Sequence, residues 1–388
     1  MNFFENLNFL WESILNIDWK QIVMIVIGGL LIFLAIKKKM EPALLLPMGF
    51  GAILVNLPFS GVLTQSMEGV GDVTGPIQWL FEVGIESSEI FPLLLFIGIG
   101  AMIDFGPLLS NPKLIFFGAA AQIGIFITII LASLLMPLLP GSTATINDFA
   151  SIGIIGAADG PTSILVSQVL KSEYVGAIAV AAYSYMALVP IIQPLAIKAV
   201  TTKKERRIRM AYNPKNVTKT AKIIFPIVVT IIAGLIAPAS ISLVGFLMFG
   251  NLIKESGVLN DLAETASKAL VNLVTLLLGI TISFSMQADK FVTWETLLIM
   301  GLGLFAFVID TMGGVLFTKF INLFSKNKIN PMIGAAGISA FPMSARVVQK
   351  LGLEADPENH LLMHAVSANV AGQIASVLAG GIILGILL

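Results

Sequence analysis

Long apolar stretches alternate with short polar connections along almost the whole chain. Ten of these stretches are long enough, or nearly so, to cross the roughly 30 Å hydrocarbon core of a bilayer as α-helices. They lie at about residues 21–36, 43–57, 88–105, 113–140, 174–197, 222–238, 241–253, 267–286, 292–322 and 361–388. The pattern predicts an all-α polytopic membrane protein with about ten transmembrane helices.

Two further apolar segments, at about 149–170 and 331–351, contain strong helix breakers. The dipeptide Gly160-Pro161 interrupts the first segment, and Pro342 interrupts the second. Proline removes a backbone donor and disfavours helical geometry in the residue before it. We therefore expect two broken or re-entrant elements in addition to the crossing helices.

Composition supports a lipid environment and excludes several classes of function. Hydrophobic residues make up 56% of the 388 residues and charged residues 12%, about half the share that is usual in soluble domains. The 23 basic and 23 acidic residues balance, so nucleic acid is not an expected partner. No cysteine occurs, which excludes disulfides, thiolate metal sites and cysteine nucleophiles. The expected partner of the apolar surface is the lipid bilayer.

Basic loops predict the orientation. Lys37, Lys38 and Lys39 follow the first apolar stretch, and a basic linker occupies residues 198–221. Both should be cytoplasmic, because lysine and arginine accumulate on that side of membranes. Counting from an external N-terminus, the linker reaches the cytoplasm only if the element broken at Asp159 does not cross. Each half of the chain then has five crossings and one re-entrant element.

A weak sequence repeat relates the two breaks. With a shift of 181 residues, six of fifteen positions are identical, against roughly one expected by chance. The matched segments are residues 156–170, GAADGPTSILVSQVL, and 337–351, GISAFPMSARVVQKL. Since each half has an odd number of crossings, the repeat must be inverted in the membrane. We expect an interfacial segment at 1–20, a first repeat at 21–197 and a second at 222–388.

Asp159 is the first candidate for chemistry. A carboxylate at membrane depth is costly and is by default a functional hypothesis. The alternative is that Asp159 caps a helix whose first turn begins at Pro161, and both roles are compatible. Thr162 and Ser163 follow directly, and hydroxyls, carbonyls and a carboxylate are the ligands that a hard cation prefers. The motif predicts a sodium site.

Polar residues of two later helices are further candidates. Asn369 and Ser376 are seven residues apart and share one face of the last helix, so both are expected to bind sodium; helix packing is the alternative. Tyr185 could donate a hydrogen bond or proton to the site, or could lie at a membrane interface. Asp310 lies deep in an apolar stretch, and we regard it as functional rather than incidental.

Arg346 and Ser344 follow the second break. A guanidinium at this position could hold a carboxylate through paired hydrogen bonds. The alternative is an arginine that extends its charge to the cytoplasmic membrane surface. No phosphate-binding loop, nucleotide fingerprint or hydrolase triad is present, so transport driven by ATP on this chain is not expected.

Several long motifs, taken together, resemble one known family along nearly the whole chain. They are 100–107 GAMIDFGP, 156–162 GAADGPT, 182–190 AYSYMALVP, 249–252 FGNL, 339–346 SAFPMSAR and 363–372 MHAVSANVAG. In these motifs the chain is similar to the beta subunit of sodium-pumping biotin-dependent decarboxylases. That family includes the beta subunits of oxaloacetate, methylmalonyl-CoA, glutaconyl-CoA and malonate decarboxylases.

The resemblance implies a specific activity. This subunit would decarboxylate carboxybiotin and export Na⁺ with consumption of a proton, in the plasma membrane of a bacterium or archaeon. Asp159 would be central to sodium binding together with Asn369, and Tyr185 and a nearby serine, assigned to Ser376, would handle ions or protons. From the chemistry of the guanidinium, and not from the resemblance, we expect Arg346 to be a catalytic residue and, with Ser344, to bind the carboxybiotin.

The resemblance also implies partners. Biotin would sit on a separate carrier protein, since this chain has no Met-Lys-Met biotinylation sequence. A carboxyltransferase alpha subunit and a small gamma or delta membrane subunit would complete an oligomeric complex. The alternative functions are a sodium-coupled secondary transporter, such as a carboxylate carrier or Na⁺/H⁺ antiporter, and a nonenzymatic membrane anchor.

Overall fold

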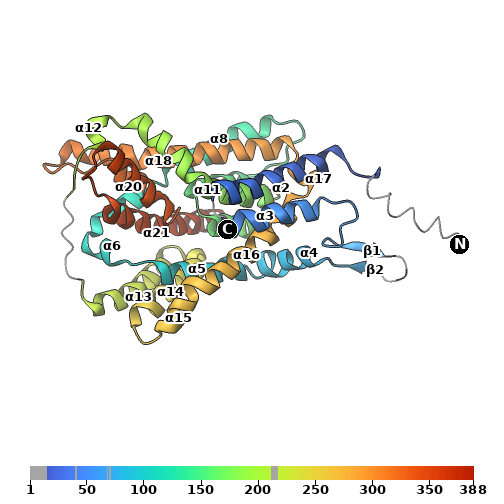
Figure 1. Ribbon diagram of the computed structural model, residues 1–388, viewed down its shortest axis with the longest axis horizontal. Helices are drawn as coiled ribbons and strands as arrows, with labels where there is room; N and C mark the ends of the chain where they lie inside the picture. Colours follow the sequence, from blue (N-terminus) through green and yellow to red (C-terminus); the bar gives the residue numbers. More distant parts are fainter. Residues whose placement is uncertain (1–14, 40–41, 68, 70, 211–216) are drawn as a thin grey trace. The chain divides into compact units, whose positions relative to one another are not determined.

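The computed structural model describes residues 15–39, 42–67, 69, 71–210 and 217–388. Most of the expected interfacial segment and part of the basic linker, at 1–14 and 211–216, therefore lie outside the described residues. The chain forms two compact units (Figure 1). The first comprises residues 1–92 and 272–297, and the second comprises 93–271 and 298–388.

The first unit is built from helices and one small hairpin. In it, α2 and α3 pack against each other, and α3 packs against the 3₁₀ helix η8. The hairpin pairs two three-residue strands in antiparallel register. Its elements are α2 (Trp19–Lys38), α3 (Pro42–Val55), β1 (Gln65–Met67), β2 (Gly71–Val73), α4 (Pro76–Phe81), η2 (Glu82–Glu86), η8 (Ser283–Met286) and α17 (Ala288–Phe291). Three helices run from one unit into the other: α5 (Ile90–Met102), α16 (Val271–Ile282) and α18 (Trp294–Phe324).

The second unit is entirely helical in its described part and contains both helix breaks. Before the linker lie α6 (Gly106–Ser110), η3 (Pro112–Leu114), α7 (Ile115–Ala120), α8 (Ile123–Leu135), η4 (Met136–Leu138), α9 (Ile146–Gly153), η5 (Ile154–Ala157), α10 (Gly160–Val169) and α11 (Val175–Val200). From the linker onward lie α12 (Lys203–Arg206), α13 (Lys219–Ile236), η6 (Pro238–Ser240), α14 (Ile241–Ser256), α15 (Asn260–Thr265), η7 (Ala266–Leu270), α19 (Met332–Ala335), α20 (Met343–Ala355) and α21 (Leu362–Leu387).

The helical membrane architecture predicted from the sequence is confirmed. Among the described residues, six helical spans are long and apolar enough to cross a bilayer, and up to eight if each of two bent pairs is one span. The predicted crossings at 43–57 and 241–253 are the shorter helices α3 and α14, of 14 and 16 residues. The number ten and the inversion of the repeat stay predictions. The boundaries of the two repeats stay predictions as well.

Burial differs sharply between helices of the second unit. In the most apolar 18-residue stretch of α21, 72% of the residues are buried. In the same length of α13, 11% are buried. The helix α21 contacts α7, α10, α14 and α20, so it forms the centre of this unit (Figure 1). On α13, Leu235 is 80% exposed. An apolar side chain so exposed on a long helix is expected to face lipid.

Small residues allow two helices of the second unit to approach backbone to backbone. A Cβ atom added to Gly250 of α14 would lie 1.9 Å from the carbonyl oxygen of Ile97 in α5. A Cβ atom added to Gly100 of α5 would lie 1.9 Å from the carbonyl oxygen of Leu247. Membrane helices commonly use glycine in this way, because close packing replaces the hydrophobic effect between them.

This packing generates a stability prediction. Gly250→Ala should lower the free energy of unfolding by about 1–3 kcal/mol, because the added methyl group forces the two backbones apart. Gly245→Ala is the matched control, since it lies on the same helix and its added Cβ would have no described atom of another helix within 4 Å. Thermal unfolding of both variants in detergent measures the difference. Equal unfolding midpoints would contradict the close-approach interpretation.

Candidate functional site

The two broken elements meet inside the second unit. The backbone N–H of Ser339 donates a hydrogen bond of 3.1 Å to the carbonyl oxygen of Ala157. Ala157 ends the short helix η5, and Ser339 lies between α19 and α20. Both residues are buried, and the N–H of Ser339 and the carbonyl of Ala157 lack the helical partners that they would have in a continuous span. The bond therefore satisfies part of the backbone freed by each break.

The geometry at the first break follows from its sequence. Ala158 has a left-handed backbone, with φ of 52°, and this ends η5. Asp159 occupies the N-cap position of α10, and Pro161 lies in the first turn, where its missing N–H has no cost. Gly160 allows the ring of Tyr183 to approach, because an added Cβ would lie 2.3 Å from the ring atom Cζ.

The carboxylate of Asp159 accepts hydrogen bonds from two hydroxyl groups. It is 4% exposed. Its Oδ2 accepts from Oγ1 of Thr162 at 2.6 Å and from Oγ of Ser376, on α21, at 3.1 Å. Ser163 donates its hydroxyl to the backbone carbonyl of Asp159 at 2.8 Å. The structure thus gathers four of the five residues expected to bind sodium, although 217 positions separate Asp159 from Ser376.

Asn369, the fifth residue, lies at the second break. Its side-chain amide donates to the carbonyl oxygen of Ile338 at 2.7 Å. Its Oδ1 is buried and has no donor among the described residues. Ser339 donates its hydroxyl to the carbonyl of Gly372 at 3.0 Å, which ties the same break to α21. The face of α21 from Asn369 to Ser376, about 10 Å long, therefore contacts both breaks.

The two tyrosines of α11 have different surroundings. The hydroxyl of Tyr185 donates to the backbone carbonyl of Met300 in α18. Tyr183 instead packs on Gly160, beside Asp159, and its buried hydroxyl has no partner within the described part of the chain. Residues two apart point to different faces of a helix, so only one of them can face the site. The structure places Tyr183 there, a residue that we did not single out from the sequence.

The candidates on α20 also separate. Ser344 is buried, donates its hydroxyl to the carbonyl of Ala335 at 3.2 Å and accepts from Nε2 of Gln193 at 2.6 Å. Arg346 is exposed and lines an open hollow of about 530 Å³. The other residues that line it are Gln349, Lys350, Leu353, Glu354 and Leu362. Arg346 is thus placed to meet a ligand from outside, whereas Ser344 is engaged in packing.

Asp310 serves a structural role in part. It is fully buried on α18, and its Oδ1 accepts from the backbone N–H of Gly124, in the first turn of α8. A carboxylate at this place satisfies an amide that the helix start leaves free, and it interacts favourably with the positive end of the helix. Its Oδ2 has no donor among the described residues and lies close to Gly156, before the first break.

The donor set around Asp159 suits a small hard cation. The carboxylate and backbone carbonyl of Asp159 and three hydroxyls supply oxygen atoms, which are the ligands that such a cation prefers. Over the residues that the structure describes, no three or more His, Cys, Asp or Glu side chains gather into a metal cluster. A monovalent cation bound at Asp159 would neutralise the charge of the carboxylate, whose burial in an apolar layer is otherwise costly.

Comparisons with known proteins agree with this architecture. The family model described as "Na+-transporting oxaloacetate decarboxylase beta subunit" matches residues 20–387. The chain is 46% identical to the methylmalonyl-CoA decarboxylase subunit beta of Propionigenium modestum, over 96% of both chains. It is 43% identical to the oxaloacetate decarboxylase beta chain of Klebsiella pneumoniae, over 98% of both.

A third relative has yet another substrate in its name. The chain is 47% identical to the glutaconyl-CoA decarboxylase subunit beta of Acidaminococcus fermentans, over 94% of this chain and 93% of the relative. All three relatives are decarboxylase beta subunits or beta chains by name, and they match nearly end to end. The resemblance seen in the motifs is therefore confirmed, and the chain belongs to the family of beta subunits of Na⁺-transporting decarboxylases.

Proposed function

We propose that this chain decarboxylates carboxybiotin presented by a carrier protein and couples that step to Na⁺ export, with Asp159 as the central ion ligand. The buried carboxylate of Asp159, placed where two helix breaks meet, is the observation that carries the proposal. The names of the relatives favour this function over a stand-alone sodium-coupled carrier. Na⁺ is the transported substrate.

Sodium would bind at Asp159, with Thr162, Ser163 and Ser376 as hydroxyl ligands. A hydroxyl that donates to a carboxylate or carbonyl still has lone pairs for a cation. Asn369 would supply its unpartnered Oδ1 from the second break. Because Na⁺ and H⁺ both neutralise the same buried carboxylate, the two ions would compete for it, and arrival of a proton would favour release of sodium.

Carboxybiotin would bind in the open hollow lined by Arg346. A guanidinium forms two parallel hydrogen bonds to a carboxylate, which fixes its orientation. Lys350 lines the same hollow and adds a second positive charge, while Leu353 and Leu362 offer apolar contacts for the biotin rings. Ser344 would support α20 through its bonds to Ala335 and Gln193 rather than touch the ligand.

The two sites would be coupled through the second break. Arg346 lies in the first turn of α20, and its backbone N–H donates to the carbonyl of Pro342 in that break. Ser339 in the same break bonds to Ala157, two residues before Asp159. A ligand shifts a conformational equilibrium only by its differential affinity for the two states. Decarboxylation would remove the carboxylate from the hollow. The protein would then lose the preference for one conformation that the bound carboxylate imposes, and the breaks would be free to rearrange.

The subunit would work in a larger assembly. Membership in the family makes this chain one subunit of a multi-subunit decarboxylase. The proposed partners are a carboxyltransferase alpha subunit, a small gamma or delta membrane subunit and a biotin carrier protein. Tyr185, bonded to Met300, and Tyr183, next to Asp159, are the candidates for delivering the proton that decarboxylation consumes.

Asp159→Asn should abolish sodium-dependent decarboxylation and Na⁺ uptake in the complete complex reconstituted in proteoliposomes. The amide retains the shape of the side chain but has no charge to offset the cation. Avidin-sensitive uptake of ²²Na⁺ measures the effect. Asp148→Asn is the matched control, because Asp148 is a buried carboxylate that bonds to Thr145 and Ser172 away from the site. It should lower stability and leave the sodium dependence unchanged.

Wild-type sodium dependence in Asp159→Asn would overturn the assignment of the ion site. Loss of decarboxylation in both aspartate variants would point to a general requirement for folding instead, and circular dichroism of the purified variants would separate these cases.

Ser376→Ala should weaken half-saturation by sodium about tenfold, because it removes one oxygen ligand and one hydrogen bond to Asp159. Ser367→Ala is the matched control on the same helix, since within the described residues the hydroxyl of Ser367 bonds to the carbonyl of Met363 and not to Asp159. Initial rates over a series of sodium concentrations test the pair. The same shift in both variants would mean that α21 packing, and not ligation, is responsible.

Arg346→Lys should raise the KM for the carboxylated carrier about tenfold, because lysine keeps the charge but loses the paired hydrogen bonds. Arg346→Gln should raise it further. Steady-state decarboxylation with purified carrier measures both. If lysine replaced arginine without any change in KM, Arg346 would be a membrane-surface arginine and not a ligand of the carboxylate.

A further inference from the structure

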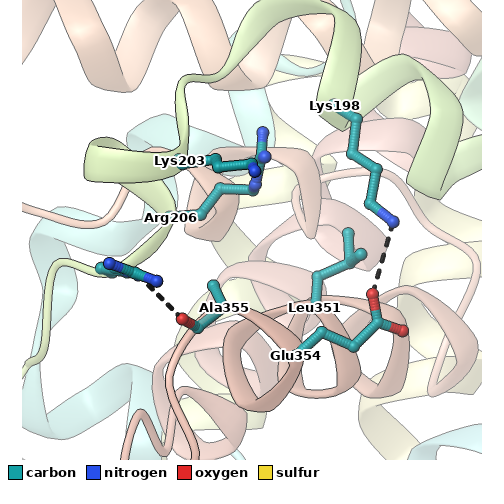
Figure 2. A pocket seen from close by; sticks show the side chains of 7 residues that line it. Lys198, Lys203, Arg206, Leu351, Glu354 and Ala355 are labelled. Atoms are coloured by element: carbon teal, nitrogen blue, oxygen red, sulfur yellow. Dashed lines mark hydrogen bonds and ion pairs between the residues drawn. The ribbon is translucent and has the colours of Figure 1, made fainter.

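A second hollow, of about 230 Å³, lies beside the end of α20 and collects basic side chains (Figure 2). Lys198 comes from the last turn of α11, while Lys203 and Arg206 come from α12. Figure 2 shows the side chains of Lys203 and Arg206 among those that line the hollow. The complete lining is Lys198, Lys203, Arg206, Arg207, Leu351, Glu354 and Ala355.

Three of the four basic side chains that line this hollow form no ion pair within the described residues. Its one acidic residue, Glu354, forms an ion pair of 3.3 Å with Lys198. Arg206 donates to the carbonyl and hydroxyl of Thr201, and Arg207 donates to the carbonyl of Ala355, all neutral acceptors. In the described parts of the chain, no carboxylate forms an ion pair with Lys203, Arg206 or Arg207. Like charges that line the same hollow repel one another, and a bound anion would relieve the repulsion.

The segment that carries these cations is held firmly. Asn330 and Asn359 both donate to the backbone carbonyl of Arg206, at 3.0 and 2.9 Å. The guanidinium of Arg209 forms two hydrogen bonds to Asp356, and it holds the pKa of that carboxyl below its usual range. The backbone that carries the basic side chains is therefore positioned, so the ordering required when an anion binds is confined to the side chains.

The apolar surface next to the hollow indicates the nature of the anion. On α11, Ile191 and Leu195 are 52% and 67% exposed. Lys198 follows them on the same helical face, about 10 Å along the axis from Ile191. The stripe lies on the second half of α11, Leu188–Val200, which forms a candidate span only as a bent pair with Val175–Met186, and we expect it to face acyl chains. An acyl chain along the stripe would bring its headgroup to Lys198.

We propose that this hollow binds the phosphate group of an anionic phospholipid at the membrane surface. Basic pockets between membrane helices are suited to such headgroups. The volume of about 230 Å³ leaves room for a phosphate group, and the exposed apolar stripe on α11 favours a lipid as its source. This lipid site is distinct from the hollow at Arg346, although Glu354 lines both, and it does not depend on the proposed carboxybiotin chemistry.

Thermal unfolding of the full chain in detergent micelles tests the proposal. Phosphatidylglycerol should raise the midpoint of the wild-type protein by about 2–4 °C more than phosphatidylcholine does. Lys203→Gln/Arg206→Gln should lose most of this increment. Lys203→Gln alone should lose part of it, and it is informative because Lys203 makes no hydrogen bond or ion pair within the described residues.

The control variant Lys204→Gln/Lys113→Gln removes two exposed lysines that do not line the hollow, and it should keep the full increment. An equal loss in the control and in Lys203→Gln/Arg206→Gln would overturn the proposal, because the effect would then follow net charge. An increment reproduced in full by inorganic phosphate would show a free-anion site instead of a lipid site. One reproduced by polyglutamate would indicate a surface for an acidic protein.

Discussion

The structure of the second unit depends on how backbone groups are satisfied where two helices break within an apolar layer. An unpaired amide or carbonyl in such a layer costs several kcal/mol, so a break is tolerated only where another part of the protein supplies a partner. Here each break supplies a partner for the other, through the bond between Ser339 and Ala157. The two broken segments, far apart in sequence, are thereby required to meet.

This meeting explains why α21 is the most buried of the long helices. It must reach both breaks, and small residues make that approach possible: an added Cβ on Gly372 would lie 2.2 Å from the carbonyl oxygen of Gly337. With α21 in place, Ser376 bonds to Asp159 and Asn369 bonds to Ile338. Backbone satisfaction and the candidate ion site thus use the same contacts, and a movement of either break must alter the surroundings of the carboxylate.

Much of this arrangement was predictable from local sequence. Apolar stretches of membrane length, prolines at 161 and 342 and a carboxylate beside the first of them act over a few residues, and they predicted helices, breaks and a candidate site. The number of crossings was less predictable. A helix of 14 residues such as α3 has the hydropathy of a membrane span but not the length, and hydropathy alone does not distinguish the two.

The sequence by itself determined that the protein is a helical membrane protein of the Na⁺-transporting decarboxylase family with Asp159 at a break, because hydropathy, proline geometry and long motifs are local properties. Only the tertiary structure decided which side chains surround that carboxylate. Tyr183 rather than Tyr185 faces it, since the rotation of α11 depends on packing against Gly160 and Met300. The basic hollow likewise arises only because α11, α12 and α20 converge, and convergence is set by contacts between distant segments.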